Sequence, residues 1–143
     1  MFSSPLGRAR ATADVVGSWL SLPVVVISDL AEIDHGAFAG LTNDEVEARH
    51  PGELARRARS KYSWSFPGGE SYADADVRAQ AALDAVAATG AISPVIVTHE
   101  MIGRMLLRTL LRLDTQDALK QSLPHGSVIE VWPAEARAVT RTV

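Results

Sequence analysis

The chain has 143 residues, of which 47% are hydrophobic and 22% charged, and its formal net charge is −3. This length and composition are typical of one globular domain over residues 1–143 and argue against a disordered chain. The negative net charge argues against general nucleic-acid binding. The lack of cysteine favours a cytoplasmic protein, and no apolar run is long enough for a membrane span or a signal peptide.

The first predicted elements are a helix over about residues 5–20 and a buried strand. Two serines before Pro5 are typical of a helix start, and Leu22-Pro23 ends the helix. Residues 24–27 are a short continuous apolar run, which favours a parallel strand buried on both faces. After a loop, residues 42–45 have the pattern of a capping box and predict a helix that ends near His50.

Residues 51–71 are predicted to leave the core as a surface excursion, which we interpret as a lid. Proline and glycine flank a basic, helix-compatible piece over residues 54–61. Its cations could steer an anionic substrate, but a solvated helix face is the favoured interpretation. The cations are Arg56, Arg57, Arg59 and Lys61.

The second half of the chain predicts two helices and three strands. Ser71 and Asp74 begin an alanine-rich helix that Gly90 stops. Residues 94–98 predict a second buried strand, which leads directly into another helix. The end of the chain predicts two strands, residues 127–132 and 138–143, which we expect to pair antiparallel at the sheet edge. The whole order indicates an α/β fold with a mainly parallel sheet.

The helical spacing also predicts which faces of the last two helices are buried. The expected apolar face of the first comprises Val77, Ala81, Ala82, Ala85 and Val86. That of the second comprises Ile102, Met105, Leu106, Thr109, Leu110 and Leu113. Arginines recur opposite this second face and are expected to be a solvent-exposed stripe: Arg104, Arg108 and Arg112.

His99 is the most informative candidate for a functional residue. It follows the apolar strand at residues 94–98 and precedes a helix. Ligands of parallel sheets bind at the carboxyl ends of strands, and a helix N-terminus there offers free N–H groups and partial positive charge. The pattern predicts an anion pocket that contains a histidine, although a capping or packing role for His99 is equally open.

Two further candidates fall at the same predicted sheet edge. Arg8 lies in the first turn of the first helix, where its guanidinium can bind two phosphate oxygens. Glu32, with Asp34 and His35, follows the first predicted strand, and a carboxyl beside an anion pocket can serve as a proton donor. The alternatives are a solvated arginine and a turn acid that faces water.

Four blocks of the sequence resemble the histidine phosphatase superfamily, also called phosphoglycerate-mutase-like. They are residues 3–13, 32–42, 67–71 and 97–100, and they occur in the family's order. The resemblance implies a three-layer α/β/α sandwich with a phosphate pocket of two histidines, two arginines and an acid. It also implies phosphoryl transfer through a phosphohistidine, with no metal and no other cofactor.

The resemblance assigns a role to each candidate. His99 corresponds to the second histidine, which stabilises the transferring phosphoryl group, and Arg8 to the second arginine. Glu32 corresponds to the proton donor, with Asp34 a weaker alternative. The backbone N–H groups that follow His99, beginning with Glu100, would complete the phosphate cradle. The implied partner is a small phosphorylated substrate, and a homodimer is left open.

The family's defining triplet, Arg-His-Gly at the end of the first strand, has no counterpart in the 143 residues. Arg49-His50-Pro51 imitates it, but no apolar strand precedes it and proline lacks the N–H of glycine. We therefore expect an N-terminally truncated sequence that lacks the family's first strand and helix and most of its second strand. The chain as given is then expected to be an inactive phosphatase without its nucleophile.

Three other functions are weighed against a phosphatase. A degenerate domain could bind phosphorylated ligands or a partner without turnover. A phosphoglycerate-mutase-type isomerase would need a larger lid than residues 51–71 provide. A serine hydrolase is suggested by residues 69–73 with Asp84 and His99, but no buried strand precedes Ser71 as a nucleophile elbow requires.

Overall fold

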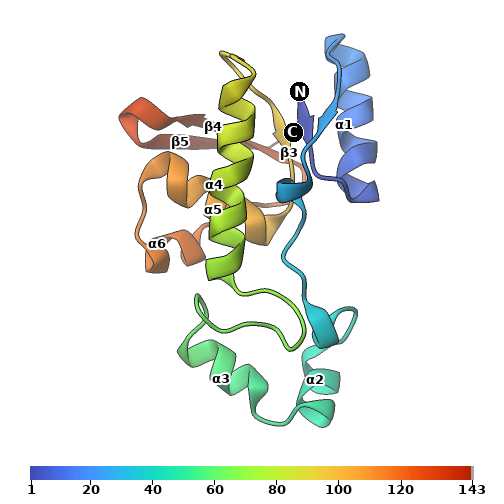
Figure 1. Ribbon diagram of the computed structural model, residues 1–143, viewed down its shortest axis with the longest axis vertical. Coiled ribbons are helices and arrows are strands. Elements are labelled where there is room, and N and C mark those ends of the chain that lie inside the picture. The colour runs from blue at the N-terminus through green and yellow to red at the C-terminus, as the bar shows by residue number, and fades with distance from the viewer. Residues whose placement is uncertain (143) are drawn as a thin grey trace.

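The computed structural model describes residues 1–142, which form a mixed α/β fold (Figure 1). The elements in chain order are β1 (Phe2–Ser3), α1 (Gly7–Leu20), β2 (Val25–Val26), α2 (Asn43–Arg49), α3 (Glu53–Arg59), α4 (Tyr72–Ala88), β3 (Ile96–Val97), α5 (Glu100–Leu111), α6 (Thr115–Lys120), β4 (Ser127–Trp132) and β5 (Arg137–Thr142). Helix α1 lies on one side of the strands, and α4 and α5 lie on the other (Figure 1). This arrangement confirms the predicted fold class.

The parallel sheet has three strands in the order β2-β1-β3. Phe2 pairs with Val25 on one side and Ile96 on the other, so β1 is the central strand. All three strands run in the same direction, and their carboxyl ends therefore lie at one edge of the sheet. Ser4 and His99 follow two neighbouring strands at that edge.

Strand β2 differs from its prediction. The run at residues 24–27 was expected to be buried on both faces, but Val25 and Val26 are 48% and 40% exposed. Strand β2 is the outer strand and is hydrogen-bonded to β1 alone among the described strands. A short apolar run is equally compatible with a central and an edge strand, and only the strand order decides between them.

The predicted C-terminal strands do pair antiparallel, from Ser127 with Thr142 to Trp132 with Arg137. Their expected place at the edge of the parallel sheet is wrong, because β4 and β5 form a separate two-stranded sheet that contacts α5. Val143, the last residue of the predicted second strand, lies outside the described residues.

Helix α4 begins and ends as predicted, but its buried face matches the predicted one only at Ala82 and Val86. Ser71 and Asp74 form a capping box, and Gly90 follows the helix with a φ of +72°. The buried face consists of Tyr72, Ala75, Ala79, Ala82 and Val86, so Val77 is 72% exposed instead of buried. Small alanines dominate this face, and they allow α4 to pack closely against α5.

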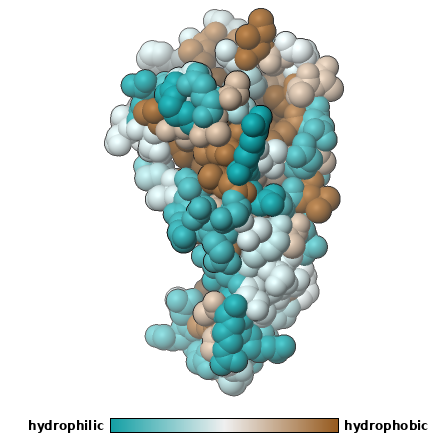
Figure 2. All heavy atoms as spheres, turned by 90° about the vertical axis from the view of Figure 1, so that its left-hand side faces the viewer, coloured by the Kyte–Doolittle hydropathy of each residue, from teal (hydrophilic) through white to brown (hydrophobic). Residues whose placement is uncertain are grey.

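The predicted excursion is attached to the core through a paired loop. Helices α2 and α3 project from one end of the molecule (Figure 1), and the surface there is mostly hydrophilic on the face that Figure 2 shows. The Ala37 N–H donates to Pro67 O at 2.8 Å, and the Glu70 N–H donates to Asp34 O at 2.9 Å. A Cβ on Gly36 would lie 2.2 Å from Pro67 O, so this close approach requires glycine.

Aromatic rings fill the inside of the excursion. The ring centroids of Trp64 and Phe66 are 5.0 Å apart, and that of Phe38 lies 5.6 and 5.8 Å from them. These distances are typical of stabilising aromatic pairs, so Trp64 and Phe66 contribute to packing inside the excursion. Closure of residues 51–71 over a site stays a prediction.

Candidate active site

The sheet edge brings His99 and Ser4 into direct contact. The Nε2 atom of His99 lies 2.7 Å from the Ser4 Oγ. The two residues are 95 positions apart but are 9% and 0% exposed, respectively. Because β1 and β3 are hydrogen-bonded neighbours, the residues that follow them meet. His99 is also the N-cap of α5, with extended backbone angles, as its place between strand and helix predicted.

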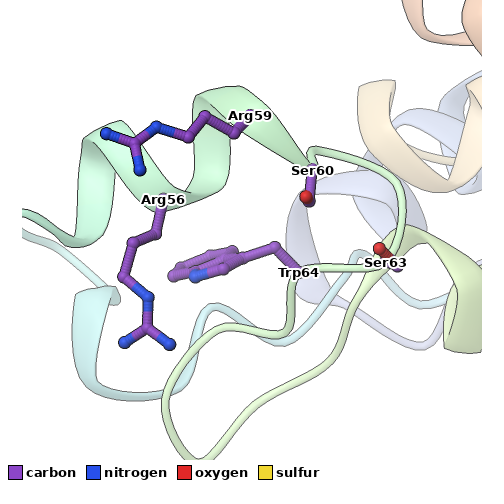
Figure 3. Close-up of a pocket in the computed structure, with 5 residues that line it drawn as sticks. All are labelled: Arg56, Arg59, Ser60, Ser63 and Trp64. Carbon is purple, nitrogen blue, oxygen red and sulfur yellow. The ribbon is translucent and has the colours of Figure 1, made fainter.

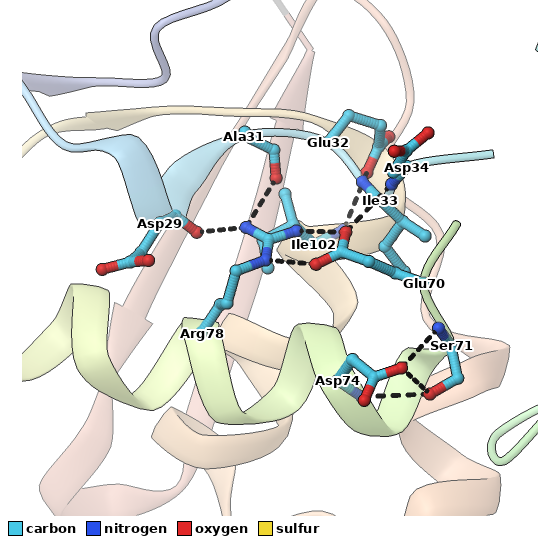
Figure 4. A network of polar contacts seen from close by, with 10 residues as sticks. All are labelled: Asp29, Ala31, Glu32, Ile33, Asp34, Glu70, Ser71, Asp74, Arg78 and Ile102. Carbon is cyan, nitrogen blue, oxygen red and sulfur yellow. Dashed lines mark hydrogen bonds and ion pairs between the residues drawn. The ribbon is translucent and has the colours of Figure 1, made fainter. Parts of the chain in front are cut away.

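Glu32 binds the N-terminus of α5. Its Oε1 accepts a hydrogen bond from the Ile102 N–H at 3.0 Å, and its Oε2 accepts one from the Met101 N–H at 3.2 Å. Figure 4 includes Glu32 and Ile102. The N-terminal amides of α5 thus bind a carboxylate of the chain itself, and an anion pocket for a ligand at this place stays a prediction. The donors are the two residues after Glu100, the expected first member of the cradle. A phosphate group that used these amides would have to displace Glu32.

Arg8 completes the group of predicted site residues. It is the second residue of α1 and is exposed. Burial lowers the pKa of His99, the Arg8 charge lowers it further, and the Glu32 carboxylate opposes both effects. Arg8 and Glu32 are therefore each close enough to His99 to interact with it electrostatically. His99 is held neutral near pH 7 beside one cation and one anion.

Asp34 and His35 shape the loop that carries Glu32. The Asp34 Oδ1 accepts a hydrogen bond from the Gly36 N–H at 2.8 Å, which is a local turn contact. The His35 ring packs on Phe66 at 4.6 Å, and its Nε2 lies 3.2 Å from the Met101 Sδ. Of the two acids, Glu32 is the one that points at the α5 N-terminus, which supports it over Asp34 as a candidate site residue.

An ion pair that the sequence analysis missed fixes the same loop to α4. The Nε and Nη2 atoms of Arg78 donate to Glu70 at 2.7 and 2.8 Å, and its Nη1 donates to Asp29 O at 2.8 Å and Ala31 O at 3.2 Å (Figure 4). Burial raises the pKa of Glu70, but the hydrogen bonds from Arg78 and from the Asp34 N–H outweigh this effect and lower it. Glu70 lay in a recognised sequence block, whereas Arg78 had no local signal.

The predicted solvent stripe on α5 is wrong for two of its three arginines. Arg104 donates to the Tyr72 hydroxyl at 2.7 Å, to Gln121 O at 2.9 Å and to Glu100, and its side chain is 15% exposed. Arg108 forms an ion pair with Asp76 at 2.9 Å. Helix α4 packs beside this face of α5, so the arginines pair with its residues. Arg112, at the C-cap of α5, is exposed as expected.

The cations of the excursion are divided between two surroundings. Arg56 and Arg59 line an open cavity of about 270 Å³ with Trp64, Ser60 and Ser63 (Figure 3). Arg57 lies over the Phe66 ring at 5.3 Å, and Lys61 lies over the Tyr72 ring at 5.9 Å.

Neighbouring charges also change the pKa of Lys61. Burial lowers the pKa of Lys61, and the Arg104 and Arg57 charges lower it further. The favoured prediction of a solvated basic face therefore holds for Arg56 and Arg59, which are exposed, but not for Arg57 and Lys61, which are half-buried.

The alternative serine hydrolase site does not form. The Ser71 Oγ donates to Asp74 at 2.7 Å and accepts from the Asp74 N–H, so it caps α4. Asp84 accepts a hydrogen bond from Gln80 on the exposed side of the same helix. No group of three or more potential metal ligands occurs within residues 1–142. In the same residues, no helix is both long and apolar enough to cross a membrane.

Comparison with known proteins identifies the family. The profile of the histidine phosphatase superfamily (branch 1) matches residues 1–143, and the chain therefore belongs to this superfamily. A bifunctional protein of Mycobacterium tuberculosis is 42% identical over 111 residues, which are 76% of this chain and 30% of that protein. Phosphoserine phosphatase 1 of Hydrogenobacter thermophilus is 30% identical over 140 residues, which are 97% of this chain and 66% of that enzyme. The chain thus spans less than a third of the first relative's length and about two thirds of the second's.

Solved structures agree with this assignment. A mycobacterial glucosyl-3-phosphoglycerate phosphatase, determined in complex with inorganic phosphate, is 28% identical and gives a TM-score of 0.77 over 99% of this chain and 74% of that one. The same phosphatase in complex with VO3 gives a TM-score of 0.74. The fold described above is therefore the histidine phosphatase fold, and this relative binds phosphate and vanadate.

Proposed function

We propose that the chain contributes the phosphate site of a phosphomonoester hydrolase of the histidine phosphatase type, with a small phosphorylated molecule as substrate. The observation that carries the proposal is the N-terminus of α5, where His99 is the N-cap and Glu32 accepts from the helix amides, with Arg8 near enough for its charge to lower the pKa of His99. A cation, a hydrogen-bonding imidazole and backbone amides are the groups that stabilise a transferring phosphoryl group. The phosphate and VO3 complexes of the mycobacterial phosphatase support the same substrate class.

Each residue has a distinct role in this proposal. The Arg8 guanidinium neutralises charge on the phosphoryl oxygens, and His99 donates a hydrogen bond to one of them. Glu32, when protonated, gives its proton to the leaving oxygen as the ester P–O bond breaks. The Met101 and Ile102 N–H groups donate to the phosphoryl group after the bound phosphate has displaced Glu32 from them.

The nucleophile is the part of the mechanism that these 143 residues do not supply. In the family's mechanism a histidine nitrogen forms a bond to phosphorus, and water later takes the phosphoryl group from it. The chain has four histidines, and of these only His99 follows a strand; His35 and His125 lie in loops and His50 ends α2. We therefore propose that the 143-residue chain binds phosphate but does not hydrolyse phosphomonoesters at the family's rates.

Turnover of p-nitrophenyl phosphate tests this proposal. The 143-residue chain is compared with a version extended at its N-terminus by an added segment that ends in an Arg-His-Gly strand. We expect phosphate binding by both and hydrolysis by an extended version that contains an Arg-His-Gly strand. Rapid hydrolysis by the 143-residue chain would contradict the assignment of the nucleophile. Phosphate binding without hydrolysis by either version would favour the degenerate binding domain.

Glu32→Gln tests the proton donor, with Asp34→Asn as its matched control. Glutamine keeps an oxygen that can accept from the α5 amides but has no acidic proton. In an active, extended version we expect Glu32→Gln to lower kcat by about 100-fold, the lower end of the usual range for general acids. Asp34→Asn should change kcat less than threefold. An equal loss of kcat in both variants would contradict the assignment of Glu32 as the proton donor.

A further inference from the structure

The Ser4 hydroxyl is the one side-chain group hydrogen-bonded to the imidazole of His99 among the described residues. Ser4 has no exposed surface, and its backbone N–H donates to Val97 O at 2.9 Å in register with the sheet. Its position is thus set by strand pairing. The 2.7 Å between its Oγ and the His99 Nε2 is a short, well-formed hydrogen bond.

Hydrogen-bond accounting gives the direction of this contact. A hydroxyl has one proton to donate and two lone pairs to accept with. The Ser4 Oγ accepts from the Leu6 N–H at 3.2 Å, and within residues 1–142 its remaining partner is the His99 Nε2. If Nε2 carried the ring proton, the buried Ser4 hydroxyl would have no acceptor, which is costly. Both groups are satisfied when Ser4 donates to an unprotonated Nε2.

We infer that Ser4 is a positioning residue that holds His99 as the Nδ1–H tautomer, with its Nδ1–H as the donor available to a phosphoryl oxygen. The inference rests on the proposed function, since it adds a reason why His99 can donate there. A hydrogen bond at one ring nitrogen sets the proton on the other. The charged groups that face His99 are Arg8 from α1 and Glu32 from the preceding loop, and Arg8 together with burial keeps the ring neutral.

Ser3, the last residue of β1 and the neighbour of Ser4, provides a matched control. It also has no exposed surface, but its hydroxyl donates to the Ser4 carbonyl oxygen at 2.9 Å. Ser3→Ala and Ser4→Ala each delete one buried hydroxyl from neighbouring positions. Only Ser4→Ala deletes the donor to His99. Ser4→Cys keeps the volume of the side chain and replaces the hydroxyl with a weak donor, so it separates hydrogen bonding from packing.

The experiment records the nitrogen-15 signals of the His99 ring in the 143-residue chain, together with affinity for inorganic phosphate. We expect the wild type and Ser3→Ala to carry the proton on Nδ1. Ser4→Ala and Ser4→Cys should shift it to Nε2 and weaken phosphate binding about tenfold, the effect of one net hydrogen bond.

Three outcomes would overturn the inference: a wild-type ring protonated at Nε2, unchanged tautomers in both Ser4 variants, or a tautomer shift without loss of affinity relative to Ser3→Ala. If the wild type binds no phosphate, the proposed function fails and its donor role for His99 fails with it. The ring signals then decide separately whether Ser4 sets the tautomer. If Ser4→Ala does not fold, Ser4→Cys decides alone.

Discussion

Ser4 and His99 at the sheet edge are buried at the ends of paired strands, whereas Arg56 and Arg59 of the excursion stand on α3, a seven-residue helix without a buried residue. Both regions offer positive charge to an anion. Only the sheet edge also fixes its groups, through strand pairing and the amides of α5. We therefore propose the phosphate site at the sheet edge, where the backbone fixes two polar groups, and not at the arginines of α3.

The largest expected loss of stability comes from disrupting the paired loop that attaches the excursion to the core. Gly36→Ala places a Cβ against Pro67 O in a residue with a φ of +49°, and the backbone cannot yield without opening the paired loop. We expect a loss of about 3 kcal/mol or more in the free energy of unfolding, measured with urea. Gly40→Ala is the control, since a Cβ there meets nothing within 4 Å at a φ of +75°. It should cost only about 1 kcal/mol, and an equal loss in both would disprove the clash.

A somewhat smaller loss is expected from the ion pair that fixes the Glu32 loop. Arg78→Ala removes four hydrogen bonds and leaves the half-buried Glu70 without its cation. We expect about 2–3 kcal/mol of destabilisation. Arg56→Ala breaks an exposed pair with Glu53 in the excursion and should cost under about 1 kcal/mol. Thermal unfolding of both variants measures which one is destabilised more. A greater loss of stability in Arg56→Ala would contradict the claim that the ion pair of Arg78 is the stronger one.

Arg8→Ala should weaken phosphate binding without unfolding the chain. A charge-assisted hydrogen bond contributes about 2 kcal/mol, which is roughly a 30-fold loss in affinity. Arg10→Ala is matched in helix and chemistry, but Arg10 lies around the helix and pairs with Asp14 at 3.8 Å. Its affinity should stay within about twofold of the wild type. If isothermal titration gave equal losses of phosphate affinity for Arg8→Ala and Arg10→Ala, the effect would come from net charge and not from a specific site.

The smallest effect concerns pH. The folded pKa of His99 lies below its ordinary value of 6.5, so the unfolded chain binds more protons between these two values. The free energy of unfolding should therefore fall as pH drops below about 6.5 and stop falling, for this group, below the folded pKa. Urea titrations between pH 5 and 8 measure this dependence of the free energy of unfolding on pH. His99→Gln should flatten this part of the profile, and an unchanged slope would show that His99 is not the group responsible.

Local patterns in the sequence predicted what local contacts determine. The capping boxes at Thr42 with Glu45 and at Ser71 with Asp74 involve residues three apart, and both helices begin where expected. Helix α6 was missed, although its N-cap Asp114 accepts a hydrogen bond from the Asp117 N–H in the same local way.

Long-range contacts could not be predicted in this way. The exposure of β2 depends on the order of strands, and the pairing of Arg104 with Tyr72 depends on which helix lies beside α5. The bond from the Ile102 N–H to Glu32 joins residues 70 positions apart. The sequence placed Arg8, Glu32 and His99 at the correct strand and helix ends, but it gave no sign that Glu32 occupies the α5 amides or that Ser4 binds His99.

The central claim is that phosphate binds at the α5 N-terminus and displaces Glu32. Titration of the 143-residue chain with inorganic phosphate, followed through the backbone amide signals, tests it most directly. The account predicts that the Met101 and Ile102 amides and the His99 ring shift together and saturate, while residues 56–64 in the excursion stay unchanged. Shifts confined to the cavity beside Trp64, with the α5 amides unaffected, would contradict it.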